Sequence, residues 1–326
     1  MRKYLNGSNV PLSMAVFLAT DSYDHNDECI SVTTLLKPLK QIILSSRVPQ
    51  DQGLADIQGL VQSRMGTAIH DGIECAWLSN HKEAMAALGY PQRIIDRVLV
   101  NPTPDQLFDG CIPVYLERRS DRMVLGRKVS GKFDFVGDGR LEDFKSTSVY
   151  TWIHGTKDDD YIWQGSLYRW LNQDIITSDE MAIQFLFTDW SAMGARQDSK
   201  YPQQRTLQKT YPLKSVEEAE HFVTSKIRLL DRYWDADEAD IPNCSDVELW
   251  RSEPKYKYYK DPAKASLGGR STKNFDDKQA AYIHRGQQGV GVVVEVPGEV
   301  KACRYCAGFA ICNQAKNLIA TGNLTL

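Results

Sequence analysis

The sequence predicts an α/β protein in which a mixed central sheet is flanked by helices. Two short strand-like segments, 130–136 and 140–146, meet at Gly137-Asp138-Gly139, a typical hairpin turn because glycine tolerates positive φ angles. Segments with apolar residues at helical spacing lie before and after this hairpin. An apolar run at 181–187 predicts a further strand, which we expect to be parallel to one strand of the hairpin.

The composition is that of a globular protein that is not inserted in a membrane. Of the 326 residues, 42% are hydrophobic and 25% are charged, and no apolar run is long enough for a membrane helix. The basic start of the chain has no apolar stretch after it, so we expect no secretory signal and a cytoplasmic protein. With a net charge of −3 and a pI near 6.1, any contact with nucleic acid depends on local basic patches.

We expect three parts along the chain. Residues 1–28 are polar and aperiodic and predict a lead-in, residues 29–235 predict the α/β core, and residues 236–326 predict a basic insertion closed by a cysteine cluster. Apolar periodicity predicts helices over 31–43 with a kink or boundary at Pro38, over 56–78, over 81–88, and over 161–172. Four strands, 112–118, 122–129, 132–136 and 140–146, are expected to form one antiparallel meander. A capping box at Ser215 and Glu218 predicts a long final helix of the core that ends near Trp234.

The hairpin carries a pattern of charges that suits a metal-dependent reaction. Asp134 and Asp143 would meet at one end of it, with Lys145 two residues further and on the same strand face as Asp143. Two carboxylates form a hard-oxygen site for Mg²⁺ or Mn²⁺. A lysine beside them can hold a phosphate oxygen. A metal site and such a lysine together suit attack on a phosphodiester. Taken alone, D-x-K is common by chance and also fits a solvated hairpin.

Two further motifs surround the hairpin in order. Upstream, His70 follows Gly66 by one helical turn. Glu74 follows one turn later, where it could hold the imidazole ring or reach the metal through water. Downstream, Gln164 and Tyr168 stand at i, i+4 spacing and therefore on one face of one helix.

The ordered set G-x-x-x-H, G-x-x-D, D-x-K and Q-x-x-x-Y resembles the PD-(D/E)xK nuclease superfamily. It is most similar to the RecB-like exonucleases, which include AddB and the CRISPR-adaptation exonucleases, and to related phage proteins. The resemblance covers about residues 31–187 and the C-terminal cysteines. It implies a restriction-endonuclease-like core in which His70, Asp134, Asp143 and the carbonyl of Phe144 bind Mg²⁺ or Mn²⁺. Lys145 would position or deprotonate the attacking water, and Gln164 and Tyr168 would orient the substrate strand.

The resemblance implies a metal-dependent deoxyribonuclease, most simply an exonuclease acting on single-stranded DNA or duplex ends in replication, recombination or repair. The chain has no P-loop motif, so a helicase, recombinase or single-strand-binding protein is an expected partner, and an oligomer is compatible with the sequence. A phage-encoded protein would work in the host cytoplasm. One alternative is a non-catalytic DNA-binding or assembly subunit on a nuclease-like fold, and another is a phosphohydrolase of small nucleotides.

A cysteine cluster near the C-terminus predicts a second metal site. Cys303, Cys306 and Cys312 form C-x2-C-x5-C, a spacing that suits zinc or an iron–sulfur cluster. In the iron–sulfur members of the resembled family, such a triplet completes a [4Fe–4S] cluster with a cysteine that precedes the histidine motif. The cysteine would be expected directly after residues 31–35, but Lys37-Pro38-Leu39-Lys40 stands there instead. We expect Cys244 as the fourth ligand, with Cys29 as the second choice, and a structural role for a [4Fe–4S] cluster or, alternatively, Zn²⁺.

Basic residues gather in two regions. Residues 254–285 contain eight Lys and Arg against three Asp, interleaved with Tyr256, Tyr258 and Tyr259, a mixture that suits phosphate contact with base stacking but also suits an exposed surface hairpin. Seven Lys and Arg residues between 118 and 140 predict either a phosphate track or a solvated face.

Overall fold

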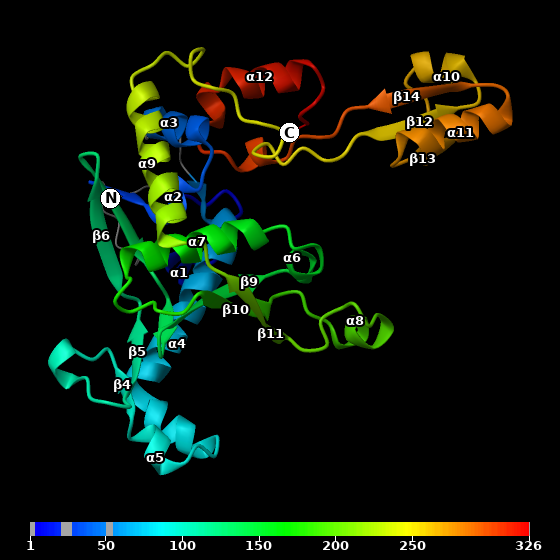
Figure 1. Ribbon diagram of the computed structural model, residues 1–326. Helices are drawn as coiled ribbons and strands as arrows, with labels where there is room; N and C mark the ends of the chain where they lie inside the picture. The colour runs from blue at the N-terminus through cyan, green and yellow to red at the C-terminus, as the bar shows by residue number, and fades with distance from the viewer. Residues whose placement is uncertain (1–3, 21–27, 50–54, 326) are drawn as a thin grey trace. The chain divides into compact units, whose positions relative to one another are not determined.

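A computed structural model describes residues 4–20, 28–49 and 55–325 (Figure 1). The chain forms two compact units. The first unit comprises residues 1–37 and 54–229, and the second comprises residues 38–53 and 230–326. The segment 38–53, which the sequence division assigned to the core, thus belongs with the C-terminal part of the chain. No helix of the described residues combines the length and the apolar character that a bilayer crossing requires.

The first unit is built on a six-stranded mixed sheet with the order β11-β10-β9-β8-β5-β4. Its strands are β4 (Val98–Val100), β5 (Ile112–Leu116), β8 (Phe135–Gly137), β9 (Arg140–Thr147), β10 (Glu180–Phe187) and β11 (Thr206–Pro212). Strand β10 is parallel to β9, and β8 is antiparallel to both β9 and β5. The predicted mixed sheet and the parallel placement of 181–187 are therefore confirmed.

The β8–β9 hairpin turns as its glycines predict. Gly137 pairs with Arg140, so Asp138 and Gly139 alone form the turn. Their φ angles are 49° and 82°, and a two-residue turn with positive φ at both positions matches the right-handed twist of the strands.

The predicted four-stranded meander is wrong in its pairing. Strands β6 (Arg119–Val124) and β7 (Arg127–Lys132) form a separate hairpin, which joins β2 (Cys29–Ser31) in a three-stranded sheet. The chain leaves the central sheet at Glu117, where φ is +47°, and β8 returns to pair with β5 directly. Alternation of polar and apolar residues marks strands but does not say which neighbour each one pairs with.

Helices cover both faces of the central sheet around β9. Helix α4 (Val61–Ala87) contacts the face that carries Phe144, and helix α7 (Asp158–Leu171) contacts the face that carries Asp143 and Lys145. The two helices predicted at 56–78 and 81–88 are one helix, because no glycine or proline separates them; a 3₁₀ turn at Ile57–Leu60 precedes it.

The remaining elements of the first unit are shorter. They are β1 (Tyr4–Leu5), α1 (Leu12–Ala19), α2 (Val32–Leu35), β3 (Ala55–Asp56), α5 (Gln92–Ile95), α6 (Val149–His154) and α8 (Ala192–Gln197), with a 3₁₀ turn at Pro104–Gln106. The prediction of an aperiodic lead-in is wrong for the described residues before 20, since Leu18 of α1 is buried and its carbonyl accepts a hydrogen bond from Arg64 of α4.

The second unit contains α3 (Leu39–Arg47), α12 (Asn313–Ala320), two 3₁₀ turns at Ala302–Tyr305 and Phe309–Ile311, and a small α/β module. That module, from Lys255 to Val296, consists of β12 (Lys255–Tyr259), α10 (Pro262–Ser266), β13 (Lys273–Phe275), α11 (Lys278–Gln288) and β14 (Val292–Val296). Helix α9 (Val216–Tyr233) precedes the second unit's main segment, and the boundary predicted at Pro38 is confirmed because α2 ends before it and α3 begins after it.

Candidate metal centre

The hairpin brings Asp134 and the middle of β9 together. Asp134 lies one residue before β8, and its Oδ2 accepts a hydrogen bond of 3.0 Å from the backbone N–H of Phe144. Because Phe135 pairs with Glu142, Asp134 stands beside the segment from Asp143 to Lys145. The two aspartates of the sequence motif therefore meet at one end of the hairpin.

His70 reaches this end of the hairpin from α4. Its Nε2 lies 3.1 Å from the carbonyl oxygen of Phe144, and its Nδ1 lies 3.4 Å from Asp134 Oδ1. Gly66, one turn earlier, allows the helix to approach β9, since a Cβ at this position would stand 3.3 Å from Ser146 Oγ. The histidine motif and the first acid thus come together as the sequence predicts.

Glu117 completes the group, and sequence reasoning missed it. Its Oε1 lies 3.5 Å from His70 Nδ1, the position predicted for Glu74, and its backbone N–H donates to the carbonyl of Asp134 at 2.9 Å. Lys132 forms an ion pair with the other carboxylate oxygen. The available clue was an acid near the end of the predicted strand 112–118, but only the direct pairing of β5 with β8 places that acid beside the hairpin.

His70, Glu117 and Asp134 each offer one ligand atom, and these three atoms lie within 4.8 Å of one another. An imidazole nitrogen with two carboxylate oxygens is a donor set that Mn²⁺ and Mg²⁺ accept, and the carbonyl of Phe144 lies beside it. Compared with the predicted ligands, Glu117 enters this compact group and Asp143 stands next to it. The side chains fit a hard divalent cation.

Asp143 belongs to an adjoining polar chain. Lys145 Nζ lies 2.5 Å from Asp143 Oδ2, and the amide of Gln164 lies 3.4 Å from Oδ1. The same amide donates to the hydroxyl oxygen of Tyr168 at 3.0 Å. The structure therefore links the D-x-K motif with the Q-x-x-x-Y motif through direct contacts.

The packing behind this chain explains Gly131 of the G-x-x-D motif. A Cβ at this position would stand 2.9 Å from atoms of Leu171 and Val32 and 3.0 Å from a ring carbon of Tyr168. The missing side chain lets α7 approach β7 closely enough for Gln164 to reach Asp143.

The charges of the centre support one another. Burial disfavours the charged form of His70, but hydrogen bonds to Asp134 and Glu117 outweigh it and raise the pKa of His70 to about 10. Burial likewise opposes ionisation of Asp134, yet His70 holds the pKa of Asp134 below its usual range. These three side chains therefore form a compact cation–carboxylate cluster, and a metal ion would have to replace the imidazole proton.

For Asp143 and Lys145, burial and the neighbouring charges combine differently in setting the pKa values. Burial, partly opposed by Lys145, raises the pKa of Asp143 to about 6. Burial alone would lower the pKa of Lys145, but Asp143 and Asp134 keep it above its usual value. Lys145 is thus a persistent ammonium group, which favours the predicted positioning role over the predicted deprotonation of water.

The four predicted cysteine ligands line one pocket in the second unit. Cys244, Cys303, Cys306 and Cys312 share it with apolar side chains, including Leu44 and Leu249. Gln314 holds the loop of Cys244, accepting from its N–H and donating to its carbonyl, both at 2.8 Å. The second-choice ligand, Cys29, lies in β2 of the first unit.

The cysteine pocket favours neutral thiols unless a cation compensates. Burial, followed by the charges of Glu248 and the other three cysteines, raises the pKa of Cys244 to about 12, and burial also raises the pKa of Cys303. Among the described residues, no three cysteine sulfurs lie within 4.8 Å of one another, unlike the donor atoms at His70. A metal bound by these residues would be held by thiolates in a largely apolar surrounding.

One prediction about basic residues needs correction, and the other stays a prediction. Tyr256, Tyr258 and Tyr259 are buried, with 8%, 1% and 7% of their surface exposed, so they are not available for stacking on bases. Between residues 118 and 140, at least four of the seven basic side chains form ion pairs, namely Arg122 with Glu220, Lys128 with Asp121, Lys132 with Glu117, and Arg140 with Glu142.

The chain matches no protein-family model, and the comparison with curated proteins finds no match. Among solved structures, one described as "Crystal structure of SSO0001" is similar, with 14% sequence identity and a TM-score of 0.38, covering 64% of this chain and 80% of that chain. This likeness is too distant to carry an argument about function.

Proposed function

We propose that this protein is a divalent-metal-dependent deoxyribonuclease with a restriction-endonuclease-like core. The observation that carries the proposal is the compact group of His70, Glu117 and Asp134 donor atoms. The Asp143–Lys145 ion pair stands beside it. A bound Mg²⁺ or Mn²⁺ would stabilise the charge that develops on an attacked phosphodiester.

Each remaining group has a task that its contacts support. The ammonium of Lys145, fixed by Asp143, would hold a phosphate oxygen and orient the attacking water. Gln164 contacts both Asp143 and Tyr168, and so these side chains would orient the scissile strand. We infer an exonuclease used in DNA recombination or repair from the order of the four motifs in the sequence.

For the cysteine pocket we propose a structural [4Fe–4S] cluster, with Zn²⁺ as the alternative. A tetrahedral zinc ion with Zn–S bonds of about 2.3 Å needs sulfurs about 3.8 Å apart. The choice of the cluster over zinc rests on the resemblance of the C-x2-C-x5-C triplet to that of the iron–sulfur nucleases. An absorbance band near ~400 nm together with iron content would distinguish the cluster from zinc.

The direct test of the nuclease is Mn²⁺-dependent digestion of end-labelled DNA, as single strands and as duplexes. We expect stepwise loss of nucleotides from an end with the wild type. Asp143→Asn should lower the rate at least ~1000-fold, the effect of losing several kcal/mol of transition-state stabilisation, while DNA binding and the fold are retained.

The alternatives give different results in the same assay. A wild type that binds DNA but does not cut it would support the non-catalytic subunit, and hydrolysis confined to mononucleotides would support a small-nucleotide phosphohydrolase. Wild-type cleavage by Asp143→Asn would remove the proposed mechanism.

A further inference from the structure

The two faces of the sheet in the small module from Lys255 to Val296 differ. Helix α11 packs on one face; on the other, the open face, Tyr259 at the end of β12 is buried, and α10 contacts β12 and β14. This antiparallel sheet has the order β13-β12-β14, and α11 packs on the face that carries Tyr258. The rings of Tyr258 and Phe275 contact His284 of α11, with centroids 5.0 Å and 5.2 Å apart. Lys257 precedes Tyr258 on β12 and therefore points to the opposite, open face.

Each acid of the module caps a helix or forms an ion pair, whereas most of its lysines and arginines have no acidic partner among the described residues. Between residues 255 and 296 there are eight Lys and Arg and four Asp and Glu. Asp261 and Asp277 cap α10 and α11, while Asp276 and Glu295 pair with Lys255 and Lys278. Within the described residues no carboxylate forms an ion pair with five of the other cations, namely Lys257, Lys260, Lys264, Arg270 and Lys273.

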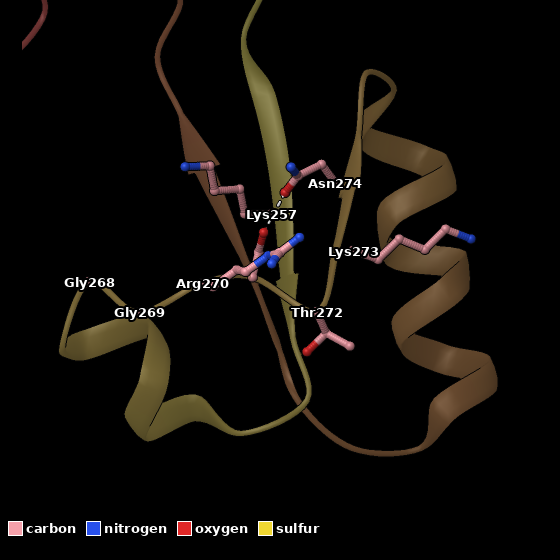
Figure 2. Close-up of a pocket in the computed structure, with 8 residues that line it drawn as sticks. Lys257, Gly268, Gly269, Arg270, Thr272, Lys273 and Asn274 are labelled. Atoms are coloured by element: carbon pink, nitrogen blue, oxygen red, sulfur yellow. Dashed lines mark hydrogen bonds between the residues drawn. The ribbon is translucent and has the colours of Figure 1, made fainter.

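Lys257 and Arg270 lie at an open pocket of about 500 Å³ on this module (Figure 2). The pocket is lined by Lys257 of β12 and by residues 268–274, which contain no aromatic side chain and no acid. Gly268 is exposed there, with a φ of +67° and no atom within 4 Å of its Cβ position. Lys273 extends from the opposite side of the strands, toward α11, where its Nζ lies 5.0 Å from the centroid of Phe275.

We propose that the open face of this module binds the sugar–phosphate backbone of DNA through Lys257 and Arg270. The choice of DNA as the polymer rests on the proposed nuclease function, whereas the choice of phosphate rests on the pocket itself. Cations without acidic partners attract phosphates, and an exposed glycine-rich backbone permits their close approach. Since the pocket has no aromatic lining and the module's tyrosines on β12 are buried, the contact is independent of base sequence.

The test is the salt dependence of DNA binding by the full chain, measured by fluorescence anisotropy without added Mg²⁺ or Mn²⁺. For the Lys257→Gln/Arg270→Gln variant and single-stranded DNA, the slope of log K against log salt should fall by about 1.4, because each lost phosphate contact removes about 0.7. Oligo-dA and oligo-dT should lose affinity equally, since no base is stacked.

The matched control is Lys278→Gln/Arg285→Gln, which removes the same charge from α11 on the other face. Its slope should change by less than half as much. Equal slopes for the wild type and the Lys257/Arg270 variant would overturn the proposal, and so would an equal effect of the control. If the double variant does not fold by circular dichroism, the single variants Lys257→Gln and Arg270→Gln should each lower the slope by about 0.7.

This result is separable from the nuclease proposal. A wild type that does not cut DNA, but whose binding slope falls in the Lys257/Arg270 variant, would leave the phosphate surface standing without the nuclease. A wild type that cuts DNA while both double variants bind with unchanged slopes would leave the nuclease standing without this surface.

Discussion

The acidic centre and the cysteine pocket are built from opposite chemistry. At the acidic centre, carboxylates are balanced by cations of the protein itself, His70, Lys132 and Lys145. At the cysteine pocket, burial and the nearby charges of Glu248 and the other cysteines raise the pKa of Cys244. An ionised sulfur there would therefore need a bound cation to stabilise it. We therefore expect that an ion bound at the first site would be exchangeable and that a metal bound at the second would be part of the fold.

Removal of one cysteine should therefore have the largest effect. We expect Cys306→Ser to lose most of the iron or zinc that copurifies with the wild type and to unfold at lower urea concentration, because metal binding is coupled to folding. Elemental analysis and urea unfolding measure both effects. Cys75→Ser, which changes an exposed cysteine of α4, is the control and should retain the metal. Unchanged metal content in Cys306→Ser would refute the site.

Substitution of Glu117 removes one proposed ligand of the acidic centre, and we expect no effect on the fold of the second unit. Glu117→Gln should weaken Mn²⁺ binding at least ~10- to 100-fold, as loss of a supporting or direct ligand commonly does. Isothermal titration calorimetry measures this change. Glu74→Gln is the matched control because Glu74 lies on the same helix as His70, yet the carboxylate found beside the imidazole is that of Glu117. If the two variants weakened Mn²⁺ binding equally, Glu74 would have to be counted as part of the metal site.

The pH dependence of Mn²⁺ binding further tests the difference between the acidic centre and the cysteine pocket. His70 has a pKa of about 10 beside its two carboxylates, so it carries a proton below that pH and must release it to bind a metal. Affinity should therefore rise as pH rises from 6 to 9, by up to tenfold per pH unit for one released proton. Titration in buffers of different ionisation enthalpy counts the protons. His70→Gln should bind more weakly and release fewer protons, and a pH-independent wild type would contradict the assignment.

The sequence predicts the parts of the acidic centre that lie within continuous segments. The turn at Asp138 and Gly139, the spacing of Asp143 and Lys145, and the helical spacing of Gln164 and Tyr168 are all local properties, and the structure has them. Glu117 depends instead on the departure of β6 and β7 into a second sheet. Strand patterns do not specify that pairing, which is decided by packing of segments far apart in the chain.

The basic segment, residues 254–285, also shows what the sequence alone does not predict. Its composition predicts phosphate contact and base stacking alike, because tyrosines alternate with lysines. In the structure this alternation places Tyr258 under α11 and Lys257 on the open face. A period of two identifies two faces, but only the tertiary fold says which face is buried.

The smallest predicted effect concerns how firmly the acidic centre is held. Gly131→Ala should destabilise the protein by about 1–3 kcal/mol, because its new methyl group would overlap Leu171, Val32 and Tyr168. Gly72→Ala is the control: it lies in α4, nothing stands within 4 Å of the added Cβ, and alanine there should stabilise by about 0.5–1 kcal/mol. Urea unfolding measures both. Since Tyr168 and Gln164 share one helix face, Gly131→Ala should also weaken Mn²⁺-dependent cleavage while the metal content of the cysteine pocket stays constant. Loss of that metal instead would show that the two sites are not independent.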